Sequence, residues 1–479
     1  MRVRKLVSLT PAAHVVLDAC RRAGGRPLVV GGSVRDAFLH LPSKDLDIEV
    51  HGVELALLQR ELERVGTVDA VGRAFGVLKV RRHHEDFDVS LPRVDSKVGD
   101  GHRGFEVRVD HNLTELEAFG RRDFTINAMG WDPHTEELID PFDGVGDLRR
   151  WTLRHTTDAF ADDPLRVLRA VQFAGRFGFK LAPETIALCR ELAPSFHELP
   201  KERVWEEFHK IATKANHPSL SLQALHDVGW EQFFPELVAV RDVPQDPHWH
   251  PEGPVHVHLG LAADMAVTFA IADGLSEQDR MVVVFAAMLH DLGKATHTAL
   301  PDPSLAATGP ARITSHGHAE AGVEPARAFL RRIGAPHWLE VKVLPIIREH
   351  MVVASMESPS PAAVRRLMRR LDHPGGRGPG MKLWATVVAA DHAARGPASG
   401  PSPADEWMEV ARRVGTPQVR AQAGILTGKH LIAAGLKPGP LFSEILAAGL
   451  EAQDAGNFST EEGAIWWLRH MQGRMARWH

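Results

Sequence analysis

Apolar and polar positions follow two different rhythms along this chain of 479 residues. Up to about residue 145, short apolar runs separated by turn residues predict strands mixed with helices. From about Asp158 to the C-terminus, apolar residues recur at helical spacing. The pattern therefore predicts a small head containing both strands and helices, followed by a helical remainder.

The most informative part of the head is a strand, a turn and a helix in succession. Leu28-Val29-Val30 predicts a buried strand, Gly31-Gly32 the tight turn after it, and residues 33–39 the start of a helix. Backbone N–H groups at such a turn, with a helix N-terminus behind them, can bind phosphate. Arg35 adds a cationic fork. The segment is therefore a candidate phosphate site.

Two carboxylates follow this turn. Asp45 and Asp47 stand two residues apart in a predicted strand, so their side chains lie on the same face. Adjacent carboxylates repel one another unless a divalent cation bridges them, and Mg²⁺ prefers oxygen ligands and substrate phosphates. Each feature alone is common, as a structural turn or a solvated face. Their order and spacing favour metal-assisted transfer of a nucleotidyl group.

Turn and breaker residues divide the rest of the chain. Residues 76–80 and 87–91 predict paired strands, and the glycine-rich segment 97–104 predicts a mobile loop. The proline-rich stretch 243–254 predicts a linker or an ordered loop that opens a new domain. Together with further breaks near 374–380 and 396–403, these positions predict four domains, which span residues 1–150, 151–240, 241–400 and 401–479.

Composition narrows the class of protein. With 44% hydrophobic and 24% charged residues, the chain is typical of a soluble globular protein. We find no apolar run long enough for a membrane span and no signal peptide. Cys20 and Cys189 are the only cysteines, which excludes a disulfide framework or a cysteine zinc cluster and favours the cytoplasm. The net charge of −5 argues against a generally basic nucleic-acid-binding protein.

Two further segments carry charged residues at informative spacing. Residues 121–129 combine a basic pair, an acid and an asparagine. In residues 162–177, Pro164 suits a first helical turn, and Asp163, Arg166 and Arg169 lie three apart, close to one helix face. A carboxylate beside an arginine can match the donor and acceptor edge of a base. Judged alone, the set would be an ordinary surface ion pair.

Together the segments from Leu28 to Phe179 resemble the class II tRNA nucleotidyltransferase and bacterial poly(A) polymerase family. The resemblance implies an α+β protein whose nucleotidyltransferase head has a mostly antiparallel sheet, followed by all-α neck, HD and tail domains. It also implies that Gly31, Gly32 and Arg35 hold the triphosphate and that Asp45 and Asp47 bind Mg²⁺. Asp88, on a neighbouring strand, is a weaker candidate for a third carboxylate.

The same resemblance implies roles for the two charged segments. Arg122 and Asp123 would face the ribose of the nucleotide. Asp163 and Arg166 would form the protein template that selects CTP or ATP, with Arg169 nearby. The loop 97–104 would help to reshape the pocket between successive bases.

A second constellation lies in the C-terminal half. Its pieces stand in the order of an HD-superfamily metal site, of which the neighbouring His-Asp pair is the diagnostic part: His258, His290, Asp291, His318, His350 and Asp391. His318 fits the family spacing better than His316, and His258 better than His256, although Leu259 replaces the usual threonine. Imidazole and carboxylate ligands suit Mn²⁺, Ni²⁺, Fe or Mg²⁺, and the ligand types alone do not distinguish among these metals.

The leading interpretation is template-independent addition of CCA to the 3′ end of tRNA from CTP and ATP. The HD domain would add phosphatase or 2′,3′-cyclic phosphodiesterase activity. A poly(A) polymerase and a partial CC- or A-adding enzyme share the head motifs and remain open. From other classes, a metal-dependent phosphohydrolase with a nucleotide-binding N-terminal half, or a noncatalytic RNA-binding protein, would leave one or both metal constellations unexplained.

Overall fold

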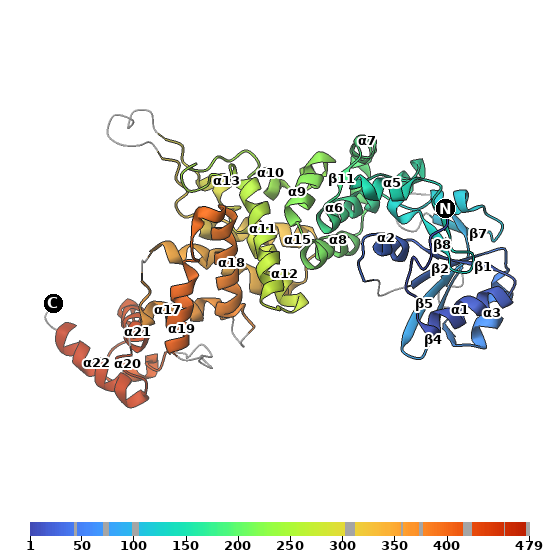
Figure 1. Cartoon of the computed structure of the whole chain (residues 1–479). Helices are drawn as coiled ribbons and strands as arrows, with labels where there is room; N and C mark the ends of the chain where they lie inside the picture. The colour runs from blue at the N-terminus through green and yellow to red at the C-terminus, as the bar shows by residue number, and fades with distance from the viewer. Residues whose placement is uncertain are drawn as a thin grey trace. The chain divides into compact units, whose positions relative to one another are not determined.

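The computed structural model describes the chain at residues 1–42, 46–69, 76–97, 105–301, 312–355, 358–372, 377–414, 424–454 and 456–475. The chain folds into two compact units (Figure 1). The first comprises residues 1–211 and 220–233, and the second comprises residues 212–219 and 234–479. The predicted division into four domains is finer than this division.

The first unit is built on a seven-stranded sheet of order β3-β4-β5-β2-β1-β8-β9. All neighbouring strands in it are antiparallel except β2 and β5, which run parallel. Its strands are β1 Arg26–Val30, β2 Leu46–His51, β3 Thr67–Asp69, β4 Val77–Arg82, β5 Glu85–Ser90, β8 Gly130–Asp132 and β9 Glu137–Ile139. A separate hairpin joins β6 Arg93–Lys97 to β7 Phe105–Val109.

Helices α1 Pro11–Arg22 and α3 Leu55–Glu63 lie side by side and pack on one face of this sheet (Figure 1). Thr10 caps α1 by accepting a hydrogen bond from the Ala13 N–H, and Pro11 occupies the first helical position. Apolar residues of alternate strand positions, such as Ile48 and Val50, complete the core on this face. The other face of β2 is therefore available for polar groups.

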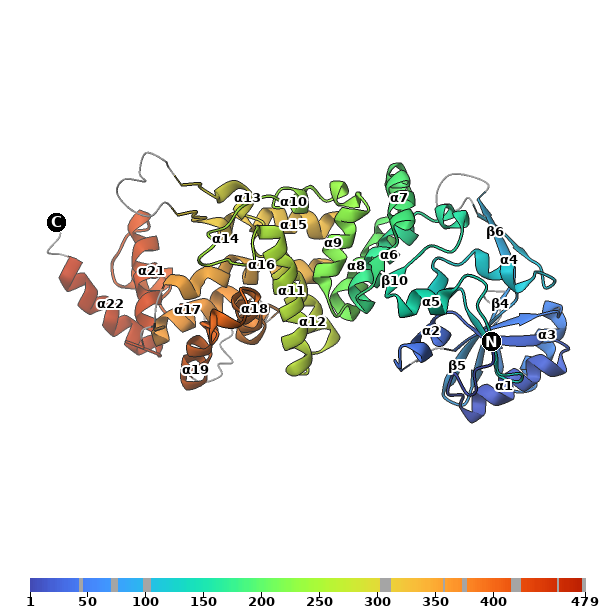
Figure 2. The same cartoon turned by 45° about the horizontal axis from the view of Figure 1, so that its top comes forward.

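The first unit continues as helices after residue 158, as the periodicity predicts (Figure 2). Its helices after α3 are α4 Glu115–Gly120, α5 Gly144–Arg149, α6 Leu165–Phe177, α7 Pro183–Glu191, α8 Lys201–Lys214 and α9 Pro218–Asp227, and the latter two extend into the second unit. A short parallel pair, β10 Thr152–Leu153 and β11 Lys180–Leu181, flanks α6 in sequence. Phe124 packs against Phe160 and against Phe173 of α6, with ring centroids 5.6 Å apart in both cases.

The second unit is mostly helical in its described residues, with an isolated β-bridge between Ala299 and Thr314. Its central helices are α11 Val255–Ala272, α12 Glu277–Leu289, α16 His337–Glu349 and α18 Gly380–Ala394. The other helices up to residue 414 are α10 Pro235–Val238, α13 Lys294–His297, α14 His318–Ala321, α15 Val323–Arg332, α17 Pro361–Leu371 and α19 Ala404–Val414. Residues 243–254 form an ordered loop that leads into α11.

Helix α11 corrects one expectation drawn from composition. Over 18 residues its mean hydropathy is 1.5, so by length and composition it could cross a membrane. Half of the helix is buried, and it packs against α12 and α18. It also carries His258, which is buried. These contacts indicate the core helix of a folded domain.

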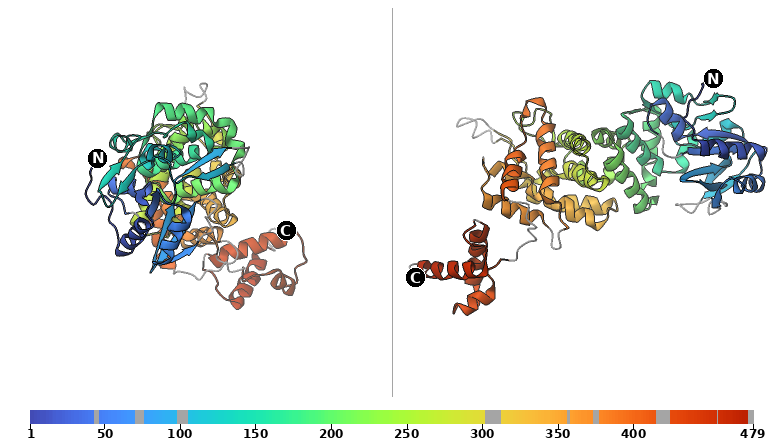
Figure 3. Two further views of the ribbon diagram at one scale, coloured as in Figure 1. Left: turned by 90° about the vertical axis from the view of Figure 1, so that its right-hand side faces the viewer. Right: turned by 60° about the horizontal axis from the view of Figure 1, so that its bottom comes forward.

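The last three helices are α20 Gly428–Ala433, α21 Pro440–Asp454 and α22 Glu461–Met475 (Figure 3). They enclose a small apolar core of their own that includes Leu431, Ile445 and Leu468. Helix α21 packs against α17. At this packing, Asp454 forms an ion pair with Arg369.

The predicted fold class is confirmed. The head contains a mixed, mostly antiparallel sheet, and the remainder is largely helical. Strands β4 and β5 pair as expected across a short turn. Of the predicted mobile loop 97–104, Lys97 ends β6, and residues 98–104 lie outside the described residues.

Replacing Phe124 by alanine should lower the stability of the first unit. The side chain is fully buried between two aromatic rings, so its loss leaves a cavity that costs about 3–5 kcal/mol. Differential scanning calorimetry of the full chain should show the transition of this unit at a lower temperature. Leu116→Ala is the control, because Leu116 is 56% exposed and its loss should leave the transition unchanged.

Candidate functional site

The turn after β1 has the backbone that a close approach requires. Gly31 has a φ of +70°, and its N–H donates to the Met129 carbonyl at 3.0 Å. A Cβ at this position would lie 2.8 Å from an Nη atom of Arg122. Glycine is therefore needed both for the conformation and for the arginine beside it. Gly32 follows as the first residue of α2 Gly32–Phe38.

Two of the predicted carboxylates lie on the neighbouring strands β2 and β5. Asp47 of β2 is the direct register partner of Asp88 of β5, so the two side chains share one face of the sheet. Asp88 is exposed and lies 3.6 Å from the Lys79 ammonium. Asp45 lies outside the described residues. The pairing of Asp47 with Asp88 is consistent with a shared cation, and the metal-binding role stays a prediction.

A cavity of about 410 Å³ gathers the charged segments. Five predicted residues line it: Arg122, Asp123, Asp163, Arg166 and Arg169. Arg121, the other member of the basic pair, lines it too, as do charged residues that the motifs did not indicate: Arg93, Arg203, Glu206, Glu207 and Lys210. Most of the latter come from α8, whose residues read as an ordinary amphipathic helix in the sequence. The cavity is rich in guanidinium donors, which suits an anionic ligand.

Asp123 is the buried centre of a hydrogen-bond network. It accepts from the Arg169 guanidinium at 2.6 and 2.9 Å and from the Asn127 amide at 2.9 Å. Burial raises the pKa of Asp123, but the Arg169 charge and these hydrogen bonds outweigh it, so the pKa lies below its ordinary value. Asp123 is therefore ionised at neutral pH and fixes the position of Arg169.

The two residues predicted to select the base are also held in place. Asp163 accepts from the Arg203 guanidinium at 2.8 and 3.2 Å and from the Leu165 N–H at 3.1 Å. Arg166 donates to the carbonyl oxygens of Ala159 and Arg121, each at 2.7 Å. Both side chains thus enter the cavity wall with defined orientations.

Arg35 lies beside the turn, since a Cβ at Gly32 would lie 3.5 Å from one of its Nη atoms. Its guanidinium is buried, donates to Asn127 at 2.6 Å and to Asp36 at 2.8 Å, and lies over the Phe177 ring. Its predicted role at the phosphates stays a prediction. Arg35 also ties α2 to α6, and the sequence spacing gave no sign of this long-range contact.

The second site assembles residues from four long helices and one short one. His258 belongs to α11, Asp391 to α18, and His318 begins α14. His290 and His350 end α12 and α16 as C-caps. Asp291 is the next residue after His290, in the turn between α12 and α13. All six predicted residues are buried.

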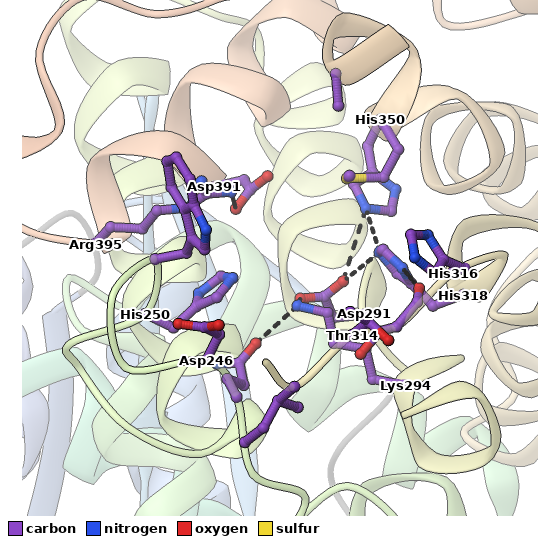
Figure 4. Close-up of a pocket in the computed structure, with 16 residues that line it drawn as sticks. Asp246, His250, Asp291, Lys294, Thr314, His316, His318, His350, Asp391 and Arg395 are labelled. Carbon is purple, nitrogen blue, oxygen red and sulfur yellow. Dashed lines mark hydrogen bonds and ion pairs between the residues drawn. The ribbon is translucent and has the colours of Figure 1, made fainter. Parts of the chain in front are cut away.

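Their donor atoms converge. Those of His258, His290 and Asp391 lie within 4.8 Å of one another, and so do those of His290, Asp291 and His350. The Nε2 atom of His318 lies 3.0 Å from Asp291 and 3.1 Å from His350 Nε2 (Figure 4). His316 is exposed at the cavity edge, and His256 contacts the Arg241 carbonyl instead.

The outer ring nitrogens explain why the inner ones are available to a cation. The Nδ1 atoms of His290, His318 and His350 contact backbone carbonyl oxygens at 2.6–2.8 Å, and His258 Nδ1 contacts Glu252 at 2.7 Å. This fixes the proton on Nδ1 and directs the Nε2 lone pairs inward. The buried Nε2 atom of His258 lies 3.0 Å from an Asp391 oxygen, and that of His290 lies 3.3 Å from an Asp291 oxygen, so both nitrogens face the carboxylates of the cluster. The donor set fits a divalent metal ion.

Several residues that contact the predicted metal ligands were not identified from the sequence motifs. Glu252 accepts from both His250 and His258, and these contacts outweigh burial and lower its pKa to about 2. Lys294 lies 2.6 Å from Asp291. Arg395 donates to Asp391 at 3.1 Å. Lys294 closes the His-Asp-Leu-Gly-Lys segment, so it could have been found from sequence, whereas Glu252 and Arg395 carry no local signal.

A cavity of about 450 Å³ opens onto these groups. Figure 4 shows Asp291 between Lys294 and the pair of His318 and His350, with Asp391 and Arg395 across the cavity. Trp249, from the loop before α11, lines it as well. The cavity thus combines a cation-binding cluster with two positive side chains, which suits a phosphate ester.

Comparisons with known proteins cover most of the chain. Residues 28–154 match the family described as the Poly A polymerase head domain. Residues 178–240 match the family described as the probable RNA and SrmB-binding site of polymerase A, and residues 256–377 match the HD domain.

Whole relatives match as well. The chain is 37% identical over 429 residues to the multifunctional CCA protein of Xanthomonas campestris pv. campestris strain B100, which covers 88% of this chain and 96% of the relative. The CCA-adding enzyme of Bacillus stearothermophilus, solved with CTP, has a TM-score of 0.60 at 20% identity and covers 98% and 100% of the two chains. The Thermotoga maritima CCA-adding enzyme, complexed with tRNA, gives 0.54 at 18% over 98% and 99%. At these identities the two structures show a shared fold.

The buried cluster predicts a pair of variants with opposite outcomes. His318→Ala should lower the divalent metal bound by the purified full chain, because it removes an inward-facing nitrogen. His316→Ala removes an exposed imidazole of the same segment and should leave the metal content unchanged. Elemental analysis after dialysis measures both. Equal metal loss in the two variants, or in neither, would contradict the predicted ligand set.

Proposed function

Since this chain belongs to the family of multifunctional CCA proteins, we infer that it adds C, C and A to the 3′ end of tRNA from CTP and ATP. The observation that carries this proposal is the charged cavity beside the Gly31 turn, which brings together Arg122, Asp123, Asp163 and Arg166. The family resemblance inferred from the motifs is confirmed. The roles below are proposals for individual residues.

The head would bind the triphosphate and the ribose of the nucleotide. The backbone amides at Gly31 and Gly32, together with Arg35, would bind the phosphates, and Arg122 and Asp123 would face the ribose. Asp45 and Asp47, with Asp88 as a weaker candidate, would hold Mg²⁺. When bound, Mg²⁺ favours deprotonation of the RNA 3′-hydroxyl and stabilises the charge on departing pyrophosphate. The chain's own contribution is to align that hydroxyl with the α-phosphate.

Base selection would depend on the pattern of hydrogen-bond donors and acceptors that cytosine and adenine have in common. Both present an amino donor next to an unprotonated ring nitrogen, whereas uracil and guanine present a carbonyl next to a ring N–H. The Asp163 carboxylate can accept from the amino group, and the Arg166 guanidinium can donate to the ring nitrogen. One fixed pair can therefore accept CTP and ATP and reject UTP and GTP.

The HD domain would hydrolyse phosphate esters, as a phosphatase or a 2′,3′-cyclic phosphodiesterase. His258, His290, Asp291, His318, His350 and Asp391 would hold Mn²⁺, Ni²⁺, Fe or Mg²⁺ there. A metal bound at that site polarises the phosphoryl group and lowers the pKa of a bound water molecule. Lys294 and Arg395 would hold the ester oxygens. We place both activities in the cytoplasm and expect no membrane partner.

The test supplies three tRNA transcripts, which end at the discriminator base, at C and at CC, with Mg²⁺ and CTP, ATP or both. We expect each transcript to grow to CCA and then stop, as read from product length on a gel. Long A tails made without use of CTP would instead identify a poly(A) polymerase. Growth that stops at CC, or that requires CC, would identify a partial enzyme.

Asp47→Ala should lower nucleotide addition by about three orders of magnitude, because it removes charge stabilisation worth several kcal/mol. Hydrolysis of bis(p-nitrophenyl) phosphate by the HD domain should persist, since its ligands lie in the other unit. Asp86→Ala removes an exposed acid of β5 and should change neither activity. Normal addition by Asp47→Ala would overturn the assignment of this carboxylate.

Asp163→Asn should weaken discrimination against UTP and GTP more than it weakens triphosphate binding. The amide keeps the shape but can no longer accept at both oxygens, and such an edge contact is worth about 1–3 kcal/mol of discrimination. Single-nucleotide addition with each of the four triphosphates gives kcat/KM for every base. Asp158→Asn, an exposed acid before α6, is the control. Full selectivity in Asp163→Asn would exclude it from base selection.

A further inference from the structure

One buried acid of the head has no place in the proposed mechanism. Glu49 belongs to β2, two residues after Asp47, so the alternation of a strand puts both side chains on one face of the sheet. Its side chain is fully buried. Its register partner is Leu28 of β1, which belongs to the apolar cluster that also contains Phe119 of α4. Glu49 is thus a carboxylate set into an otherwise apolar layer.

Two arginines and a histidine converge on this carboxylate. One oxygen lies 3.1 Å from an Nη atom of Arg122 and 3.4 Å from an Nη atom of Arg121. The other oxygen lies 3.2 Å from Nε2 of His51. Both oxygens of the buried carboxylate are therefore in contact with nitrogen atoms of these three side chains.

The position of Arg122 depends on this contact. Its guanidinium lies between Glu49 and the Gly31 turn, over the Phe119 ring. Its Nε is buried with no hydrogen-bond partner among the described residues. Glu49 is accordingly the acid that fixes this side chain on the protein side. Arg121 and Arg122 both line the charged cavity on their other side.

We propose that Glu49 is a positioning residue for nucleotide binding: it holds the guanidinium groups of Arg121 and Arg122 at the wall of the charged cavity, beside the Gly31 turn. Its effect on the nucleotide is indirect, through the two arginines. Since these groups contact the parts that all nucleotides share, Glu49 acts on binding of CTP and ATP alike. It has no part in the choice between bases. The inference rests on the proposed nucleotide addition.

The test replaces Glu49 by glutamine in the full chain. Glutamine has nearly the shape of glutamate. Its amide N–H groups would face one of the nitrogen donors that now contact Glu49, and its carbonyl oxygen carries no negative charge for the other. We expect KM for CTP and for ATP to rise by about tenfold each, which is the loss of one charge-assisted hydrogen bond. Discrimination against UTP and GTP should not change. Glu137→Gln is the control, because Glu137 lies in the same sheet but is 53% exposed and pairs with Arg26.

A double-mutant cycle separates positioning from general destabilisation. If Glu49 acts through the two arginines, Glu49→Gln should change KM by less than about twofold in a background that carries both Arg121→Ala and Arg122→Ala. A full additional loss there would overturn the proposal. So would a lower melting temperature with unchanged KM values, since that outcome is what a purely structural acid predicts.

A second variant of Glu49 and a wild-type control complete the test. If Glu49→Gln melts below the assay temperature, Glu49→Asp retains the charge and withdraws it by one methylene, and a raised KM is expected there too. Wild-type KM values in this variant would overturn the proposal. The wild-type chain is assayed in parallel: if it adds no nucleotide, the proposed function fails, whereas a negative result for Glu49 alone leaves that function intact.

Discussion

Compensation of buried charge is the constraint on which both sites depend. An ionised carboxylate inside a protein is stable only where cations or several hydrogen bonds face it. Asp123 and Glu49 satisfy this requirement with arginines, and Asp291 satisfies it with Lys294 and histidines. The pKa values of all three lie below their ordinary values in spite of burial. The charged groups that the chemistry needs are therefore already held in position by the fold.

The two sites use this constraint in different ways. In the head, guanidinium groups satisfy the buried carboxylates and still line an open cavity, which leaves positive charge for an anionic ligand. In the HD domain, the imidazoles are anchored at Nδ1, and the Nε2 atoms of His258 and His290 face the carboxylates of Asp391 and Asp291 at 3.0 and 3.3 Å. The chemistry of the first site thus suits an anionic group, and that of the second suits a metal ion.

The sequence predicted what depends on local spacing. The strand before Gly31, the paired strands around Asp88, the helix after Pro164 and the convergent His-Asp set follow from periodicity, turn chemistry and motif order. Contacts between distant segments could not be predicted this way. The hydrogen bond from Arg35 to Asn127, which lies 92 residues away, is one such contact. The hydropathy of α11 can be calculated from the sequence, but its place as a core helix follows from packing against α12 and α18, which is a tertiary property.

The long-range network also limits how the nucleotide pocket can move. Arg35 donates to Asn127, Asn127 donates to Asp123, and Asp123 accepts from Arg169 of α6. Helix α6 carries Arg166 on its first turn. Arg166, which we propose selects the base, is therefore tied through buried, charge-assisted bonds to the segment that would face the ribose. A change in base preference during synthesis must then come from elements outside this network, because moving α6 alone would break it.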